Sequence, residues 1–347
     1  MHAAPPATDL ESRLLAWMRG DGGFPSFDAA AAAVFRHQYT HNAPYRRYWD
    51  ALGHAAPAAD FHWSRAPALP TDCFKETAHP PRAFPAAEAR HAFLTSGTTR
   101  EIRGRHQFAT LALYETSIRQ GWKQLNLPAI DNPWFLAAPA ATTPESSLAH
   151  MFATLGREFP DRWLINTDGT PTLPDFSAHT TPVGLFSTSI ALFRLTQTHA
   201  PVPLPPGSWI FETGGPKGLS ITLDPAEFHH HIADFFSIPP HLVLNEYSMT
   251  ELSSQFYRWH NESSHRGPHW TRTRVVHPET NRPAAHGQPG YLEIIDLANL
   301  GSVAAIRTQD IAIATGENTF QLVGRDPAAV PRGCSRAADA AWPQPAK

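Results

Sequence analysis

The stretch His91-Ala-Phe-Leu-Thr-Ser-Gly-Thr-Thr99 decides how the rest of the chain is interpreted. Its apolar run, Ala92-Phe-Leu94, predicts a β-strand. Four hydroxyl-bearing residues and one glycine follow directly. Glycine allows close backbone approach, and Ser/Thr hydroxyls and successive N–H groups supply hydrogen-bond donors to an anion. We therefore expect a phosphate-binding turn after this strand, made by Thr95, Ser96, Gly97, Thr98 and Thr99.

The composition indicates a globular, reduced, cytoplasmic protein. Of its 347 residues, 42% are hydrophobic and 17% charged, which excludes a disordered chain. A net charge of −3 indicates neither nucleic acid nor an anionic membrane as a required partner. Its two cysteines have neither a disulfide-framework pattern nor metal-ligand spacing. No apolar run is long enough for a membrane span, and the N-terminus lacks signal-peptide features.

Hydrophobic periodicity predicts an α/β fold with largely parallel sheets packed by helices. We expect helices at residues 9–18, 27–36, 41–52, 109–125, 146–154, 190–196 and 225–236. We expect strands at residues 71–75, 134–137, 163–166, 183–186, 208–212 and 242–247, and then short strands at 271–277, 290–297, 302–306 and 320–323. The alternation of helices and strands predicts an α/β core over residues 1–265, which contains a helical segment at 1–65 and the phosphate loop at 95–104. The short strands that follow predict a smaller β-rich subdomain over residues 266–326. Residues 327–347 are expected to form a flexible tail.

Two further motifs follow the loop in a fixed order. They are Glu246-Tyr-Ser-Met-Thr-Glu251, and Arg307-Thr-Gln-Asp310 with Gly324-Arg325 close behind. Together with the loop they resemble the motifs of the adenylate-forming superfamily, whose members activate a carboxylic acid with ATP. The reaction brings a carboxylate against the α-phosphate, so its site needs many donors and a carboxylate that holds Mg²⁺.

The resemblance implies a role for each matching residue. It assigns Glu251 to Mg²⁺, Thr250 to the α-phosphate and Asp310 to the ribose hydroxyls of ATP. It also implies that Arg325 is a catalytic residue and that Tyr247 binds the nucleotide. The turn that would lie against adenine consists of Gly214, Gly215 and Pro216, with Lys217 either contacting the adenylate or exposed to solvent.

The chain departs from the superfamily pattern in the loop itself. Arg100 stands where a glycine is usual, and the lysine that normally follows is missing. Arg103 and Arg105 either replace that lysine or are solvated surface charges. Ser248 and Gln309 also replace glycines, which puts local geometry in doubt rather than the chemistry.

A closer resemblance is to the LuxE-like acyl-protein synthetases of this superfamily. It is carried by Thr71-Asp-Cys-Phe-Lys75, Ser146-Ser-Leu-Ala-His-Met151, Glu212-Thr-Gly-Gly-Pro-Lys-Gly218 and Arg332-Gly-Cys-Ser335. In this family a cysteine near the C-terminus accepts the acyl group, which makes Cys334 the candidate acceptor. The alternative is an unreactive cysteine on a frayed tail.

The spacing of Cys334 suits an acceptor. It lies nine residues past Arg325, and an extended chain of that length reaches roughly 30 Å. Arg332 and Arg336 favour the thiolate. Only residues 326–347 follow Arg325, so we expect no C-terminal lid domain. Cys73, beside an apolar residue, is expected to be structural.

The sequence therefore predicts an acyl-adenylate-forming ligase that uses ATP and Mg²⁺. The acid, fatty or aryl, would pass to Cys334 and then to a partner that the resemblance identifies as an acyl reductase. One alternative is a ligase that delivers to coenzyme A or a carrier protein, and another is a degenerate nucleotide- or acyl-binding subunit. Zinc is not favoured at His229-His-His231, since no HExxH or CxxC pattern is present. His150 is expected on a helix face or in the acyl pocket.

Overall fold

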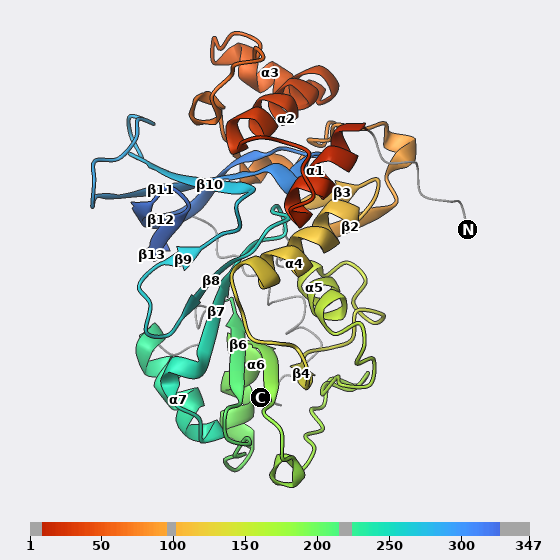
Figure 1. Cartoon of the computed structure of the whole chain (residues 1–347), viewed down its shortest axis with the longest axis vertical. Helices are drawn as coiled ribbons and strands as arrows, with labels where there is room; N and C mark the ends of the chain where they lie inside the picture. The colour runs from red at the N-terminus through yellow and green to blue at the C-terminus, as the bar shows by residue number, and fades with distance from the viewer. Residues whose placement is uncertain (1–8, 96–101, 215–223, 327–347) are drawn as a thin grey trace.

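One large sheet organises the part of the chain that the computed structural model describes, residues 9–95, 102–214 and 224–326 (Figure 1). Its 11 strands are ordered β10-β11-β12-β13-β9-β8-β7-β6-β5-β4, with β1 attached to β12, and β2 and β3 form a separate hairpin. The strands are β1 Leu69–Pro70, β2 His91–Leu94, β3 Arg105–Phe108, β4 Pro133–Leu136, β5 Gly184–Thr188, β6 Trp209–Thr213, β7 Val243–Tyr247, β8 Phe256–Trp259, β9 His265–Arg266, β10 Thr271–Val276, β11 Pro289–Asp296, β12 Ala305–Gly316 and β13 Thr319–Arg325. The α-helices are α1 Asp9–Arg19, α2 Phe27–His41, α3 Ala43–Ala51, α4 Ala112–Gln124, α5 Ser147–Leu155, α6 Ser189–Thr198 and α7 Pro225–Phe236.

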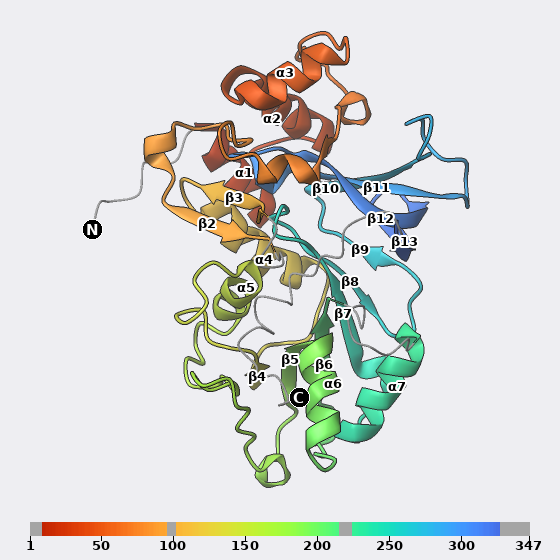
Figure 2. The same cartoon turned by 180° about the vertical axis from the view of Figure 1, so that it is seen from behind.

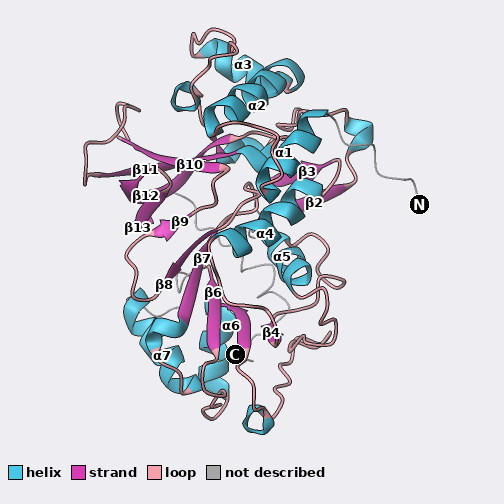
Figure 3. Ribbon diagram, in the orientation of Figure 1, coloured by secondary structure: helices cyan, strands magenta, loops and turns pink. Residues whose placement is uncertain are grey.

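Strands β4 to β7 are parallel and carry helices on both faces (Figures 2 and 3). Strands β5 and β6 are buried along their whole length, as expected of apolar runs that are covered on both sides. Helices α6 and α7 pack on one face through Leu192 and Phe236, and α4 and α5 pack on the other through Ile118 and Phe152. The carboxyl ends of these strands meet at one edge, which is where open α/β sheets bind ligands.

The helices that follow these strands begin at side-chain caps. The Ser146 side chain accepts a hydrogen bond from the backbone N–H of Ala149 at the start of α5, and the Thr188 side chain does the same for Ala191 in α6. Such caps satisfy N–H groups that have no partner inside the helix. Because Thr188 is also the last residue of β5, the strand passes into α6 without a loop and fixes the polar residues at this edge.

Beyond β7 the sheet becomes antiparallel. Strand β8 returns beside β7, and β9 to β13 extend the sheet through antiparallel pairs. Strand β12 is 12 residues long and carries the Arg307-to-Asp310 motif in its first half. The sheet therefore joins the end of β7 to the third sequence motif through hydrogen-bonded strands.

The N-terminal helices are fixed to the antiparallel half through Gln38, a fully buried residue of α2. Its Nε2 donates to the carbonyl oxygens of Asn299 and Leu300 at 2.8 and 3.2 Å, and its Oε1 accepts from the N–H of Ala304 at 3.0 Å. The same helices share an apolar core with Ile295 on β11 and Ala305 on β12. One side chain thus satisfies three backbone groups of the segment between these strands.

Gln38→Ala should lower the free energy of unfolding by about 3 kcal/mol, because three buried backbone groups would lose their partner. Denaturant titration of the variant against the wild type measures this. Gln197→Ala is the control, since Gln197 is exposed on α6 and should cost less than about 0.5 kcal/mol. A loss below about 1 kcal/mol in Gln38→Ala would contradict the role given to Gln38.

The structure confirms all seven predicted helices and the α/β class, with three corrections among the strands. Residues 71–75 form a 3₁₀-helix, not a strand, in which Lys75 and Asp72 form an ion pair at 3.1 Å. Residues 163–166 form only isolated bridges, because a turn follows at once. The strand predicted at 302–306 begins at Ala305 and runs on to Gly316. In the described part of the chain, no helix is long and apolar enough to span a bilayer.

Candidate active site

Polar residues gather where β5, β6 and β7 end. Strand β6 ends in Glu212 and Thr213, and Gly214 follows with a φ of 92°, a conformation that glycine adopts without steric cost. The turn that the sequence assigns to adenine therefore begins where a glycine is needed. Its other predicted members, Gly215, Pro216 and Lys217, lie outside the described residues.

Tyr247 joins the second and third motifs. Its hydroxyl donates to Oδ2 of Asp310 at 2.8 Å, although the two residues are 63 positions apart. Burial raises the pKa of Tyr247 well above its ordinary value, and the negative charge of Asp310 raises it further. Tyr247 is therefore a neutral donor that holds the carboxylate predicted to bind ribose.

Asp310 lies directly opposite Arg325 in the β12–β13 pair. Arg325 donates through Nη2 to Oε1 of Gln309 at 2.8 Å, and Nε2 of Gln309 donates to Oδ2 of Asp72 at 3.1 Å. Gln309, which replaces a glycine of the superfamily pattern, thus links the Gly-Arg segment to the 3₁₀-helix at Thr71–Lys75. The predicted residues Tyr247, Asp310 and Arg325 are brought together.

Thr250 and Glu251 follow β7 and are buried. His106 on β3 donates through Nδ1 to the carbonyl oxygen of Thr250 at 2.8 Å, and its Nε2 accepts from the hydroxyl of Ser302 at 2.8 Å. Burial lowers the pKa of His106 to about 4, so the ring is neutral at pH 7 and can play both roles. Nδ2 of Asn299 donates to the carbonyl oxygen of Glu251 at 2.8 Å. The backbone of the second motif is therefore held from two sides.

The first motif begins at the tip of the β2–β3 hairpin. The Thr95 hydroxyl accepts from the N–H of Gly104 at 2.7 Å, and the Thr95 N–H donates to the Gly104 carbonyl at 2.8 Å, which closes the base of the loop. Ser96, Gly97, Thr98, Thr99 and Arg100 lie outside the described residues. Since His106 of the same hairpin contacts Thr250, the loop base is tied to the second motif.

The two arginines that follow the loop, Arg103 and Arg105, have different surroundings. Arg103 donates through Nε to the Thr95 carbonyl at 2.7 Å and forms an ion pair with Glu145 at 3.3 Å, so it supports the loop base. Arg105 is exposed. Arg307 of the third motif is also structural, because it clamps the buried carboxylate of Glu293 at 2.7 Å together with Arg274.

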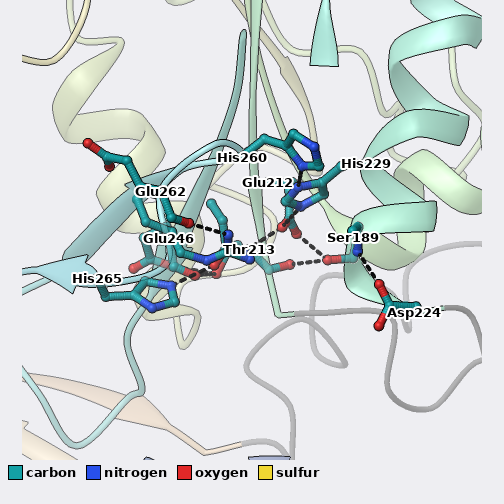
Figure 4. Close-up of polar contacts among 12 residues, drawn as sticks. Ser189, Glu212, Thr213, Asp224, His229, Glu246, His260, Glu262 and His265 are labelled. Atoms are coloured by element: carbon teal, nitrogen blue, oxygen red, sulfur yellow. Dashed lines mark hydrogen bonds and ion pairs between the residues drawn. The ribbon is translucent and has the colours of Figure 1, made fainter. Parts of the chain in front are cut away.

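Sequence reasoning missed a buried polar network under this edge (Figure 4). Glu212 accepts from His229 at 2.8 Å and from the hydroxyl of Ser189, and Nδ1 of His229 lies 3.0 Å from Nδ1 of His260. A signal was present, since Glu212 is the one charged residue in the apolar strand β6, but nothing in the sequence names its partners. His229, which we weighed as a metal ligand, instead supports this carboxylate.

Glu246 is a second buried carboxyl group at this edge. Its Oε2 accepts from the hydroxyl of Thr213 on the neighbouring strand (Figure 4). Burial raises the pKa of Glu246 to about 7, against the opposing effect of the Ser248 and Thr213 hydroxyls, and the charge of Glu212 adds to the rise. Near pH 7 this side chain therefore exists in both protonation states.

Stability should consequently depend on pH through Glu246. Its folded pKa of about 7 lies above the ordinary 4.5, so the folded state is favoured by protonation and loses stability as the pH rises from 4.5 through 7. Glu246→Gln lacks this titration and should exceed the wild type by about 3 kcal/mol at pH 8, converging with it near pH 4.5. Urea unfolding across this range measures the difference, with exposed Glu227→Gln as control. Parallel curves for Glu246→Gln and the wild type would contradict the assignment.

Glu251 offers one buried carboxylate, which is what Mg²⁺ takes from a protein when substrate phosphates supply its other ligands. Among the described residues, no group of three or more His, Cys, Asp or Glu side chains could hold an ion. Mg²⁺ is commonly bound by one or two carboxylates together with substrate phosphates. The buried carboxylate of Glu251 beside Thr250 could supply the protein's share.

A cavity of about 790 Å³ lies between β2, α4 and α5. His150 lines it from α5, and its Nε2 lies 3.2 Å from Oε1 of Glu115. His150 thus lies on a helix face that borders a cavity.

Cys73 is a half-buried free thiol, and burial raises its pKa above the ordinary value. Cys334 lies outside the described residues.

Two curated proteins are similar to parts of this chain. The long-chain-fatty-acid–luciferin-component ligase of Vibrio harveyi is 26% identical over 134 residues, which are 35% of this chain and 35% of that protein. Its counterpart from Aliivibrio fischeri is 30% identical over 93 residues, 26% of this chain and 24% of that protein. The chain thus matches about a third of the length of one relative and a quarter of the other. No protein-family model matches the chain.

Solved structures extend the likeness to nearly the whole fold. A 2-hydroxyisobutyryl-CoA ligase in complex with 2-HIB-AMP and CoA aligns over 93% of this chain and 69% of its own, with a TM-score of 0.63 at 17% identity. An open conformation of that ligase aligns over 88% and 71%, with a TM-score of 0.62 at 16% identity. The resemblance inferred from the motifs is confirmed: the chain has the fold of adenylate-forming ligases and is similar, over part of its length, to the LuxE-type ligases.

Proposed function

We propose that the protein is an ATP-dependent ligase that activates a carboxylic acid as its acyl-adenylate. The observation that carries this proposal is the Tyr247–Asp310 hydrogen bond of 2.8 Å. It joins two motifs that are far apart in sequence, at the edge of the sheet where ligands bind in α/β folds. The partial similarity to acid-activating ligases supports the same reading.

In the proposed first step, a carboxylate oxygen of the acid attacks the α-phosphorus of ATP. A new P–O bond forms, the bond to the β-phosphate oxygen breaks, and pyrophosphate leaves with the electron pair. The loop at Thr95 to Thr99 would hold the phosphates, and Lys217 would contact the adenylate. Thr250 would donate to the α-phosphate, and Asp310 would accept from the ribose hydroxyls. Mg²⁺, held by Glu251, would offset the negative charge that accumulates on the phosphates.

In the proposed second step, the thiolate of Cys334 attacks the acyl carbon. A C–S bond forms, the bond to the phosphate oxygen breaks, and AMP leaves. The thioester would then pass to a thiol of a partner protein, for which the sequence resemblance suggests an acyl reductase. A tethered thiol has a high effective concentration at the site, which favours this route over a free acceptor.

ATP–pyrophosphate exchange with a panel of fatty, aryl and short polar acids tests the first step, and intact-mass measurement after incubation with ATP and Mg²⁺ tests the second. Exchange with at least one acid, and an added mass equal to its acyl group, are expected. Exchange without added mass, and with a product on coenzyme A or a carrier protein, would favour that delivery instead. ATP binding without exchange for any acid would overturn the proposal in favour of a non-catalytic nucleotide-binding subunit.

A further inference from the structure

Oε1 of Glu246 and the hydroxyl oxygen of Tyr257 are two of the buried side-chain atoms that have no hydrogen-bond partner among the described residues. Both residues are at most 3% exposed. Glu246 on β7 and Tyr257 on β8 are direct register partners, so their side chains leave the sheet on the same face. The two side chains are therefore cross-strand neighbours on one face of the sheet.

Glu246 is four residues before Thr250, and Tyr257 packs in the core that covers the α4 and α5 face of the sheet. On the same face, Oγ1 of Thr250 lies 3.4 Å from the hydroxyl of Ser147 on α5, and Tyr114 on α4 donates to the Ser147 carbonyl at 3.0 Å. Thr250 is the residue assigned to the α-phosphate. Tyr114, Ser147 and Thr250 thus connect α4 and α5 with the segment after β7. Together with Glu246 and Tyr257 they make up a set of buried polar residues on this face, the polar cluster.

Aromatic rings fill the same face of the sheet next to this cluster. The rings of Phe186 and Phe211 lie 5.2 Å apart, Phe152 lies 5.5 Å from Phe211, and Trp122 lies 5.6 Å from the Tyr257 ring. Phe152, Phe186 and Phe211 are fully buried. A long alkyl chain that entered past Glu246 and Tyr257 would have to displace these packed rings, at a high cost in a close-packed interior.

A buried polar atom without a protein partner costs free energy, so it calls for an ordered water, an ion or a ligand group as its partner. Glu246 Oε1 can accept a hydrogen bond, and the Tyr257 hydroxyl can donate or accept one. A hydroxyl group would satisfy both atoms at once, and an amine would donate to both. A hydrocarbon group would satisfy neither.

We propose that the acid activated here is short and carries a hydroxyl or amine group that hydrogen-bonds to Glu246 and Tyr257. The inference rests on the proposed adenylation and identifies its substrate class. It separates this chain from ligases for long-chain fatty acids, although the two curated relatives are named for that substrate. Glu246 and Tyr257 are the specificity-determining residues.

ATP–pyrophosphate exchange on the full chain tests this with matched acids. The panel pairs hydroxy- and amino-substituted acids, from propanoate to hexanoate, with their unsubstituted partners, and adds tetradecanoate. The best polar acid should exceed its unsubstituted partner in kcat/KM by about 100-fold, because a site built for a hydrogen bond rejects an analogue that cannot make it. A preference for tetradecanoate would overturn the inference and leave adenylation intact, whereas exchange with no acid at all would overturn adenylation itself.

Tyr257→Phe removes one of the two unsatisfied atoms and no ring packing. It should reduce the discrimination between the polar acid and its partner by about tenfold or more while keeping or raising the thermal midpoint. Glu246→Leu removes the other atom and should also lower the discrimination. Tyr39→Phe is the matched control, since the Tyr39 hydroxyl bonds Asp50 at the surface and should not affect selectivity. Unchanged discrimination in both Tyr257→Phe and Glu246→Leu would refute the assignment.

Discussion

Replacing Cys334 with serine is expected to abolish covalent acylation of the protein while leaving ATP–pyrophosphate exchange within about twofold of the wild type. The reason is that adenylation needs no thiol, whereas the thioester requires the sulfur nucleophile. Intact mass after incubation with ATP, Mg²⁺ and the acid reports the covalent step, and exchange reports the first step. The two readouts separate loss of transfer from loss of activation.

Cys73 provides a matched control, because the chain has two cysteines. Cys73 is half-buried in the 3₁₀-helix at Thr71–Lys75, and burial, followed by the charges of Asp72 and Glu76, raises the pKa of its thiol. A less ionised thiol is a poorer nucleophile at pH 7, so Cys73→Ser should retain the acyl mass. If Cys73→Ser loses the mass and Cys334→Ser keeps it, the acceptor has been assigned to the wrong cysteine.

The sequence could predict which elements form and in what order the motifs follow. Apolar runs such as Trp209 to Phe211 are long enough to indicate strands, and the order of the motifs places Tyr247, Glu251 and Asp310 in one candidate site. It could not predict that the strand expected at 302–306 begins only at Ala305 and runs on to Gly316. Residues 307–310 are polar, yet β12 continues through them because β11 and β13 pair with it.

Buried polar partnerships are what the sequence does not contain. Gln38 contacts residues more than 260 positions away, and His106 contacts Thr250 and Ser302 at separations of 144 and 196 positions. No periodicity reports such contacts, because each depends on how distant elements meet. The same holds for Glu246, which is one residue before Tyr247 and is distinguished from an ordinary motif neighbour by its burial next to Tyr257.

Glu251→Gln is expected to lower ATP–pyrophosphate exchange by at least about 100-fold. Glutamine keeps the size of the side chain, and the bond from Asn299 to the backbone carbonyl of residue 251 does not involve the carboxylate, so the fold should persist. What is lost is the negative charge proposed to hold Mg²⁺ against the phosphates. Binding of ATP without Mg²⁺ should therefore change little, while the gain in affinity on adding Mg²⁺ should disappear.

Glu227→Gln makes the same chemical change at an exposed position of α7 and should leave both quantities unaltered. Asp310→Asn offers a second comparison, since that carboxylate is proposed to contact ribose: it should weaken ATP binding with and without Mg²⁺ alike. The two carboxylates at this edge are thus separated by their Mg²⁺ dependence. If Glu251→Gln weakened ATP binding equally in both conditions, its carboxylate would be acting on the fold or on the nucleotide rather than on the metal, and the proposed division of roles between Glu251 and Asp310 would be wrong.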